Sequence, residues 1–198
     1  MVRQLRRALR GCQTVLDIGC GVLSPMRFLQ TGCLVGVDGH VPAIEQARRN
    51  ATHDEYFCDD VRRLGERFGE RRFDGCVALD LIEHLPKDDG WRLLDQMEAL
   101  AKHRVIILTP NGFLPQQSQD GDLQQHLSGW TAAEMRTRGY QVSGMYGPKS
   151  LRGAYHRIQC RPRPLWSIIS ILLHFVSTRN CPEKAAAIFC VKDNDSPG

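Results

Sequence analysis

The chain has 198 residues, 24% of them charged, and a formal net charge of +4, which suits one globular domain with a sizeable core. The mildly basic balance fits an ordinary solvated surface and does not favour a nucleic-acid-binding or membrane protein. Eight cysteines without a C-x-x-C pair favour free thiols in a reducing compartment. Residues 1–13 are basic and lack the apolar core of a secretory signal, so we expect a cytoplasmic protein.

The predicted elements alternate between strand and helix from residue 14 onward. Residues 1–13 are expected to form a basic helix. Ser24 and Pro25 supply an N-cap and a first-turn proline for a helix after the first strand. The capping box from Thr131 to Glu134 begins a helix that Gly139 ends. The predicted strands of this part are residues 14–18, 33–38, 55–59, 74–79 and 104–109.

The pattern changes after residue 139. Residues 140–146 and 185–191 are typical of two further strands, which no simple crossover helix joins, so we expect an antiparallel end to a parallel sheet. Between them, the apolar run 165–176 is too short to span a bilayer. We expect one domain over 1–198, with a cofactor-binding core at 14–150 and a substrate-side insertion and last strand at 151–198.

Four acidic residues stand at the ends of four apolar runs. They are Asp17, Asp38, Asp60 and Asp80, separated by 21, 22 and 20 residues. Each interval accommodates a turn, a helix, a second turn and a short strand, so the carboxylates should share one edge of a parallel sheet. Ligands bind at that edge in open α/β sheets.

The segment Gly19-Cys20-Gly21 follows the first strand and predicts a sharp turn that a ligand can approach closely. A dinucleotide-binding turn has a third glycine, and Ser24 takes that place here. Asp17 would repel a pyrophosphate and attract a cation. S-adenosylmethionine carries an ammonium and a sulfonium but no phosphate, so the sequence favours this cofactor over NAD.

The other acids fit the same cofactor. Asp38 can accept both ribose hydroxyls, because a carboxylate has two acceptor oxygens. Asp60 or its neighbour Asp59 can accept the adenine amine, and Asp80 is expected near the reacting methyl. Helix capping is the alternative role for Asp38 and Asp60, and backbone shaping is the alternative for Asp80.

These motifs resemble those of class I S-adenosylmethionine-dependent methyltransferases of the small-molecule type, a group that includes quinone O-methyltransferases. The resemblance covers about residues 14–150 and departs at Leu23, where the family often has a further glycine. It implies a three-layer α/β sandwich with a seven-stranded, mainly parallel sheet and an antiparallel last strand. The cofactor-binding residues expected are Asp17, Gly19, Cys20, Gly21, Asp38, Gly39, Asp59, Asp60, Val61, Asp80 and Leu81.

The reaction expected is O-methylation of a small-molecule, lipid-linked or sugar-linked acceptor, without a metal. His84 is the candidate base because its ordinary pKa lies near neutrality, and packing or capping is its alternative role. The residues after Asp80 lack the Asn-Pro-Pro-Tyr pattern of nucleobase N-methyltransferases, which disfavours nucleic acid. Two other classes stay open, an NAD-dependent oxidoreductase and a non-catalytic S-adenosylmethionine-binding protein.

Two further segments are candidates for contact with the acceptor. His126 and Trp130 can line its pocket, although a Trp before a helix cap can equally form a hydrophobic staple. Arg157, Arg161 and Arg163 precede the apolar run 165–176. This combination indicates either a surface for a membrane or an amphiphilic acceptor, or a core helix or homodimer contact.

Overall fold

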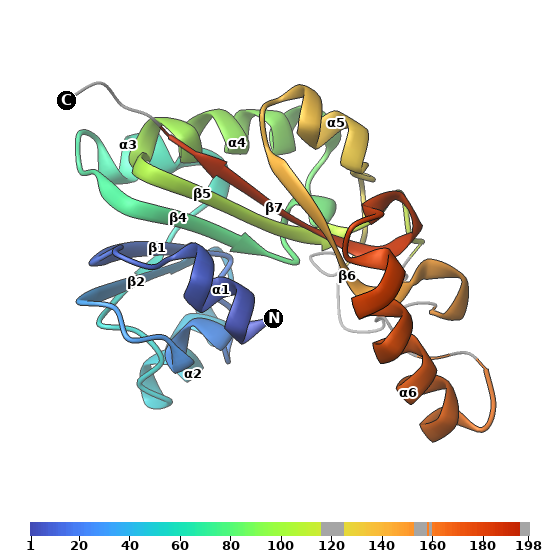
Figure 1. Cartoon of the computed structure of the whole chain (residues 1–198). Helices are drawn as coiled ribbons and strands as arrows, with labels where there is room; N and C mark the ends of the chain where they lie inside the picture. Colours follow the sequence, from blue (N-terminus) through green and yellow to red (C-terminus); the bar gives the residue numbers. More distant parts are fainter. Residues whose placement is uncertain (116–124, 153–157, 159, 195–198) are drawn as a thin grey trace. The chain divides into compact units, whose positions relative to one another are not determined.

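Figure 1 shows the computed structural model of the chain, which describes residues 1–115, 125–152, 158 and 160–194. The chain divides into two compact units. The first unit comprises residues 1–81, 88–106 and 191–198, and the second comprises 82–87 and 107–190. Arg157 lies outside the described residues.

One seven-stranded sheet has the order β3-β2-β1-β4-β5-β7-β6. It is mostly parallel with an antiparallel end, which confirms the predicted fold class. The strands are β1 (Thr14–Ile18), β2 (Cys33–Asp38), β3 (Glu55–Cys58), β4 (Phe73–Leu79), β5 (Ala101–Pro110), β6 (Gln141–Pro148) and β7 (Ala185–Asp193).

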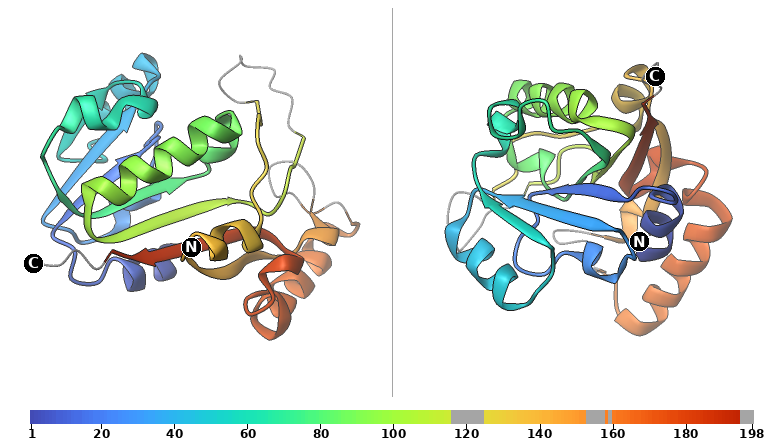
Figure 2. Two further views of the ribbon diagram at one scale, coloured as in Figure 1. Left: turned by 90° about the horizontal axis from the view of Figure 1, so that it is seen from above. Right: turned by 90° about the vertical axis from the view of Figure 1, so that its left-hand side faces the viewer.

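Within the first unit, α1 and α2 lie on one face of the sheet and α3 and α4 on the other (Figures 1 and 2). Because both faces are covered, consecutive residues of the central strands are buried, and buried positions do not alternate with exposed ones. Val15, Leu16 and Ile18 of β1 are all buried. The helices of the chain are α1 (Val2–Ala8), α2 (Val41–Arg49), α3 (Leu64–Phe68), α4 (Lys87–Leu100), α5 (Ala132–Thr137) and α6 (Arg163–Leu173).

The parallel pairing brings the ends of the acidic strands to one edge. β1 pairs with both β2 and β4, and Asp17 stands opposite Gly36 on one side and Val77 on the other. β2 in turn pairs with β3, where Asp38 stands opposite Cys58. The predicted common edge of the sheet therefore exists within the first unit.

A short 3-10 helix replaces one of the expected longer helices, and two others follow strands. The helix expected after Ser24 is only the four-residue turn η1 (Pro25–Phe28), because Cys33 already begins the next strand. Two others, η2 (Val61–Arg63) and η3 (Ile82–His84), follow β3 and β4.

The second unit contains the predicted capping box. The Thr131 hydroxyl accepts from the backbone N–H of Glu134, and the Glu134 carboxylate accepts from the backbone N–H of Thr131. Further along, α6 continues into the π-helical turn η7 (His174–Thr178). None of the helices in the described ranges has both the length and the apolar character needed to cross a bilayer.

Candidate active site

The glycine turn after β1 has the backbone geometry that its sequence predicts. Gly19 and Gly21 have φ angles of +70° and +56°, a region that side chains strongly disfavour. A Cβ added to Gly19 would lie 2.8 Å from Cδ1 of Leu81, so Leu81 packs directly on the turn. A Cβ added to Gly21 would meet nothing within 4 Å, which leaves open space beside that residue for a ligand.

Asp17 lies below this turn in a buried polar network. Its Oδ2 accepts a 2.5 Å hydrogen bond from the Ser24 hydroxyl and a 2.9 Å bond from Nε2 of His53. Asp17 is 2% exposed. The same Ser24 hydroxyl accepts from the backbone N–H of Met26 and so caps η1. Asp17 therefore holds the end of the glycine turn in place, and its contact with a cationic ligand stays a prediction.

His53 is the member of this network that the sequence analysis missed. It lies between α2 and β3, and its Nδ1 is 2.8 Å from the hydroxyl of Thr52. Nothing in its spacing from Asp17, 36 residues away in the chain, predicts that the two side chains meet. The structure alone identifies His53 as the donor that supports the buried carboxylate.

Asp38 connects the glycine turn to the end of β2. One carboxylate oxygen accepts from the backbone N–H of Gly21 at 2.9 Å, and the other accepts from the backbone N–H of His40 at 2.8 Å. Each carboxylate oxygen can accept two hydrogen bonds, so one position on each stays available for a ligand hydroxyl. Cys20, between the glycines, is buried, and burial raises the pKa of its thiol.

Asp59 and Asp60 follow β3 and have different surroundings. Asp60 caps η2 and forms a bidentate ion pair with Arg62, whose hydrogen bond lowers the pKa of the Asp60 carboxyl. Asp59 accepts the backbone N–H of Asp60 and lies 3.5 Å from the Arg67 guanidinium. Asp60 therefore has the helix-capping role that was the alternative to its contact with adenine. The side chain of Val61 is buried in η2.

Asp80 ends β4 with a φ angle of +50°, a strained conformation for a residue other than glycine. Its side chain reaches solvent, yet the surrounding protein partly desolvates the carboxyl and raises its pKa to about 6. The backbone turn at Asp80 also sets the position of Leu81 against Gly19. Gly39 lies near the same edge, where an added Cβ would touch the Asp59 carbonyl at 3.6 Å.

His84 lies in the second unit, next to two other potential metal ligands. Ligand atoms of Glu83, His84 and His126 all lie within 4.8 Å of one another. The rings of His84 and His126 meet edge to face, with centroids 4.9 Å apart. Burial lowers the pKa of both imidazoles, which keeps them neutral near pH 7. The sequence singled out each histidine separately, and only the fold brings them together with Glu83.

Trp130 does not line a pocket, which corrects one of its two predicted roles. It is fully buried, and its indole N–H donates to the Ile82 carbonyl and the Ser128 hydroxyl. The Lys87 ammonium lies 3.7 Å from the centre of its ring. Trp130 directly precedes the Thr131 cap and is buried, as the staple alternative requires.

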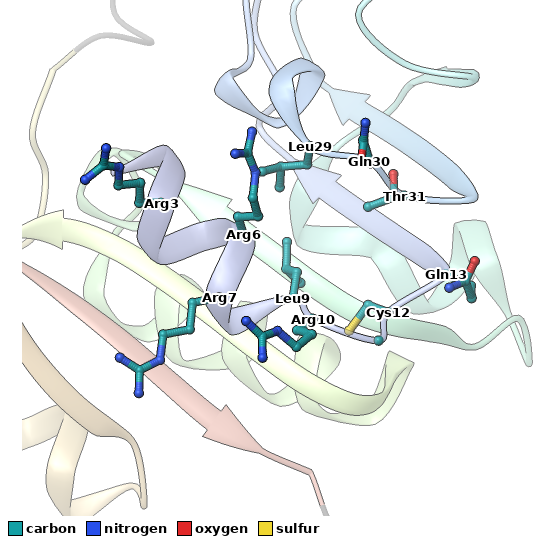
Figure 3. A pocket seen from close by; sticks show the side chains of 11 residues that line it. Arg3, Arg6, Arg7, Leu9, Arg10, Cys12, Gln13, Leu29, Gln30 and Thr31 are labelled. Atoms are coloured by element: carbon teal, nitrogen blue, oxygen red, sulfur yellow. The ribbon is translucent and has the colours of Figure 1, made fainter.

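A pocket of about 430 Å³ in the first unit contains none of the predicted site residues (Figure 3). Its wall is α1 and the loop before β2, and the Arg6 guanidinium donates to the Phe28 carbonyl. The charged residues that line it are Arg3, Arg6, Arg7 and Arg10. Four guanidinium groups without an acid do not suit a sulfonium ligand, so this pocket is separate from the cofactor site.

The strand order, the glycine turn and the acids at one sheet edge are the features expected of a class I S-adenosylmethionine-dependent methyltransferase. Residues 15–104 match the family model described as "Methyltransferase domain". Residues 15–104 thus form a methyltransferase domain, and this match favours a methyltransferase over the NAD-dependent alternative. No curated protein matches the chain in sequence.

Solved structures share the fold at low sequence identity. A SAM-dependent methyltransferase from Archaeoglobus fulgidus is 15% identical, with a TM-score of 0.62 over 97% of this chain and 90% of that chain. Magnesium protoporphyrin IX methyltransferase from Synechocystis PCC 6803 with bound SAM is 17% identical, with a TM-score of 0.53 over 96% and 77%. The plantazolicin methyltransferase BamL is 14% identical, with a TM-score of 0.58 over 98% and 82%. The named substrates differ, so the shared fold does not identify the acceptor.

Proposed function

We propose that this methyltransferase transfers a methyl group to an oxygen of a small-molecule, lipid-linked or sugar-linked acceptor. The cofactor supplies an electrophilic methyl on a sulfonium; the acceptor oxygen forms the new C–O bond, the C–S bond breaks, and its electron pair stays on sulfur. The chain's own contribution is to bind both reactants in line and to receive the hydroxyl proton.

The first unit supplies the cofactor contacts in this proposal. Asp38 accepts the ribose hydroxyls through the positions that Gly21 and His40 leave available. Asp59 is the better partner for the adenine amine, because the Arg62 guanidinium donates to both carboxylate oxygens of Asp60. Asp80 offers an exposed carboxylate to the sulfonium.

The proposed role of His84 rests on one hydrogen bond. Its Nδ1 lies 3.1 Å from the carbonyl of Gln125, and a carbonyl only accepts, so Nδ1 carries the proton. In the neutral ring, Nε2 then has the lone pair that acts on the acceptor hydroxyl. Without the Gln125 contact, the other tautomer would be equally available and the ring would not be oriented.

The His84→Ala variant tests this role. We expect turnover to fall by about 10²–10⁴-fold, with the cofactor dissociation constant unchanged in calorimetry. His103→Ala is the matched control, because His103 is exposed on β5. Transfer of labelled methyl is measured against phenols, sugars and lipid-linked glycans. Wild-type turnover in His84→Ala removes the residue from the reaction, and methylation of nitrogen or carbon acceptors alone refutes O-methyl transfer.

We also propose that α6 docks on an anionic lipid surface. Ser170 packs inward, where its hydroxyl donates to the Tyr146 carbonyl. The opposite face is apolar and open to solvent; Leu165, Ile168, Ile171 and Leu172 are each more than half exposed. From residue 149 to 181 the chain has no Asp or Glu, and its basic residues are Lys149, Arg152, Arg157, Arg161, Arg163 and Arg179. An apolar helix face flanked in sequence by basic residues and by no acidic ones matches an anionic bilayer.

Vesicle co-sedimentation tests the lipid proposal. We expect binding to phosphatidylglycerol vesicles that weakens with salt and is negligible for phosphatidylcholine vesicles. The double variant Ile168→Glu, Leu172→Glu should lose at least about 10-fold in affinity, whereas Val41→Glu on α2 should not. Equal binding of the double variant contradicts the proposal. A dimer in light scattering that the double variant dissociates, without vesicle binding by the wild type, would assign the face to a second copy instead.

A further inference from the structure

Glu83, His84 and His126 form a group that the proposed transfer uses only in part. Two of them are neighbours in η3, and the third lies 42 residues after His84 in the chain. Across the part of the chain that the structure describes, this is the one set of three or more such side chains close enough to share an ion. Two imidazoles and one carboxylate form a typical donor set for divalent first-row metals.

Backbone carbonyls orient both imidazoles in the same way. Nδ1 of His84 donates to the Gln125 carbonyl at 3.1 Å, and Nδ1 of His126 donates to the Leu114 carbonyl at 2.7 Å. Each ring therefore keeps Nε2 as its ligand atom. Metal-binding histidines characteristically donate the other ring N–H to a carbonyl or carboxylate, which fixes the tautomer and the ring orientation. Simple packing of two histidines does not require this match.

Hydrogen bonds also fix the position of Glu83. Its side chain is 2% exposed, and Oε2 accepts a 2.9 Å hydrogen bond from the Thr109 hydroxyl. Its backbone carbonyl accepts from the N–H groups of Leu127 and Ser128, which fixes the segment containing His126 against η3. A cation between the three side chains would add a favourable charge interaction for this buried carboxylate.

We propose that Glu83, His84 and His126 bind a divalent transition-metal cation and present its open coordination positions to the acceptor oxygen. Three protein ligands leave such positions free, as in catalytic rather than structural metal sites. The role in catalysis rests on the proposed O-methyl transfer; the binding itself does not. In that case Nε2 of His84 would ligate the cation and would not itself be the base; the bound cation would lower the pKa of the acceptor hydroxyl, so that its proton could pass to water.

Metal binding is measured first, on the full chain in the absence of cofactor and acceptor, after a chelator has removed any bound metal. Titration with Co²⁺ alone should show one equivalent and the visible absorption bands of a bound ion. His126→Ala and Glu83→Gln should each weaken binding at least about 10–100-fold, since loss of even supporting residues has that effect. His103→Ala should bind like the wild type. Circular dichroism verifies folding, and the half-buried His84→Ala provides a third variant if the two buried sites do not tolerate change.

The outcomes separate this inference from the proposed function. Absence of Co²⁺, Mn²⁺ and Zn²⁺ binding, or binding that the three ligand variants leave unchanged, overturns the site even if methyl transfer is demonstrated. Binding with normal transfer in excess chelator overturns the catalytic role and returns His84 to that of a direct base. Chelator-sensitive transfer that added metal restores, and that His126→Ala lacks, supports both parts.

Discussion

The two glycines of the turn after β1 provide a matched pair of substitutions. Both have positive φ, so an alanine at either position should cost about 1–2 kcal/mol in backbone strain. At Gly19 the new Cβ would also lie 2.8 Å from Leu81, and displacing that side chain should add about 1–3 kcal/mol. At Gly21 the Cβ would enter open space, so no packing cost is added.

The two alanine variants should differ in cofactor affinity in the opposite order from their loss of stability. The free space beside Gly21 is where we expect the cofactor to approach, so Gly21→Ala should weaken binding by about 10-fold or more, and its loss of stability should be limited to the backbone strain. Gly19→Ala should mainly destabilise the fold. Adding Leu81→Ala to Gly19→Ala should recover part of the clash energy, since the flexible side chain that obstructs the Cβ is then shorter.

Urea denaturation gives the stability of each variant, and calorimetric titration with S-adenosylhomocysteine gives the affinity. The reasoning is refuted if Gly21→Ala is destabilised as much as Gly19→Ala, or if it binds the cofactor like the wild type. Equal stability of Gly19→Ala with and without Leu81→Ala would refute the assigned clash alone.

Two further predictions concern the carboxylates at the same sheet edge. Asp80 has a pKa raised to about 6, so its carboxyl becomes negatively charged as pH rises through 6, and the affinity for S-adenosylmethionine should rise with it and level off above. The affinity for S-adenosylhomocysteine, whose sulfur is uncharged, should change less. Asp80→Asn should flatten the pH profile of S-adenosylmethionine binding. An affinity ratio of the two ligands that is independent of pH would place Asp80 away from the sulfonium. His53→Ala should destabilise the protein by about 2–4 kcal/mol in urea, because it removes one of the two side-chain donors to the buried Asp17 carboxylate and leaves only Ser24. A loss below about 1 kcal/mol would show that Ser24 alone supports that charge.

The parts of the fold that local patterns encode were predicted well. Apolar runs of strand length, the capping box at Thr131 and the acids at intervals of 20 to 22 residues depend on residues close together in the chain. Strands β1 and β2 have the predicted bounds, and the strand order places their ends together. The cofactor class followed from the same local information, because a single segment contains both the glycine turn and Asp17.

Tertiary structure decided what depends on distant partners. Trp130 could be a pocket residue or a staple by sequence, and its burial against Ile82 and Ser128 decided for the core.

Sequence alone therefore determined the class of fold and the cofactor, since both follow from short-range periodicity and from one contiguous motif. It did not determine the partners of the buried groups. His53 meets Asp17 across 36 residues, and His126 meets Glu83 and His84 across about 40. Such contacts arise only when packing brings loops from separate elements together, and no spacing rule in the chain records them.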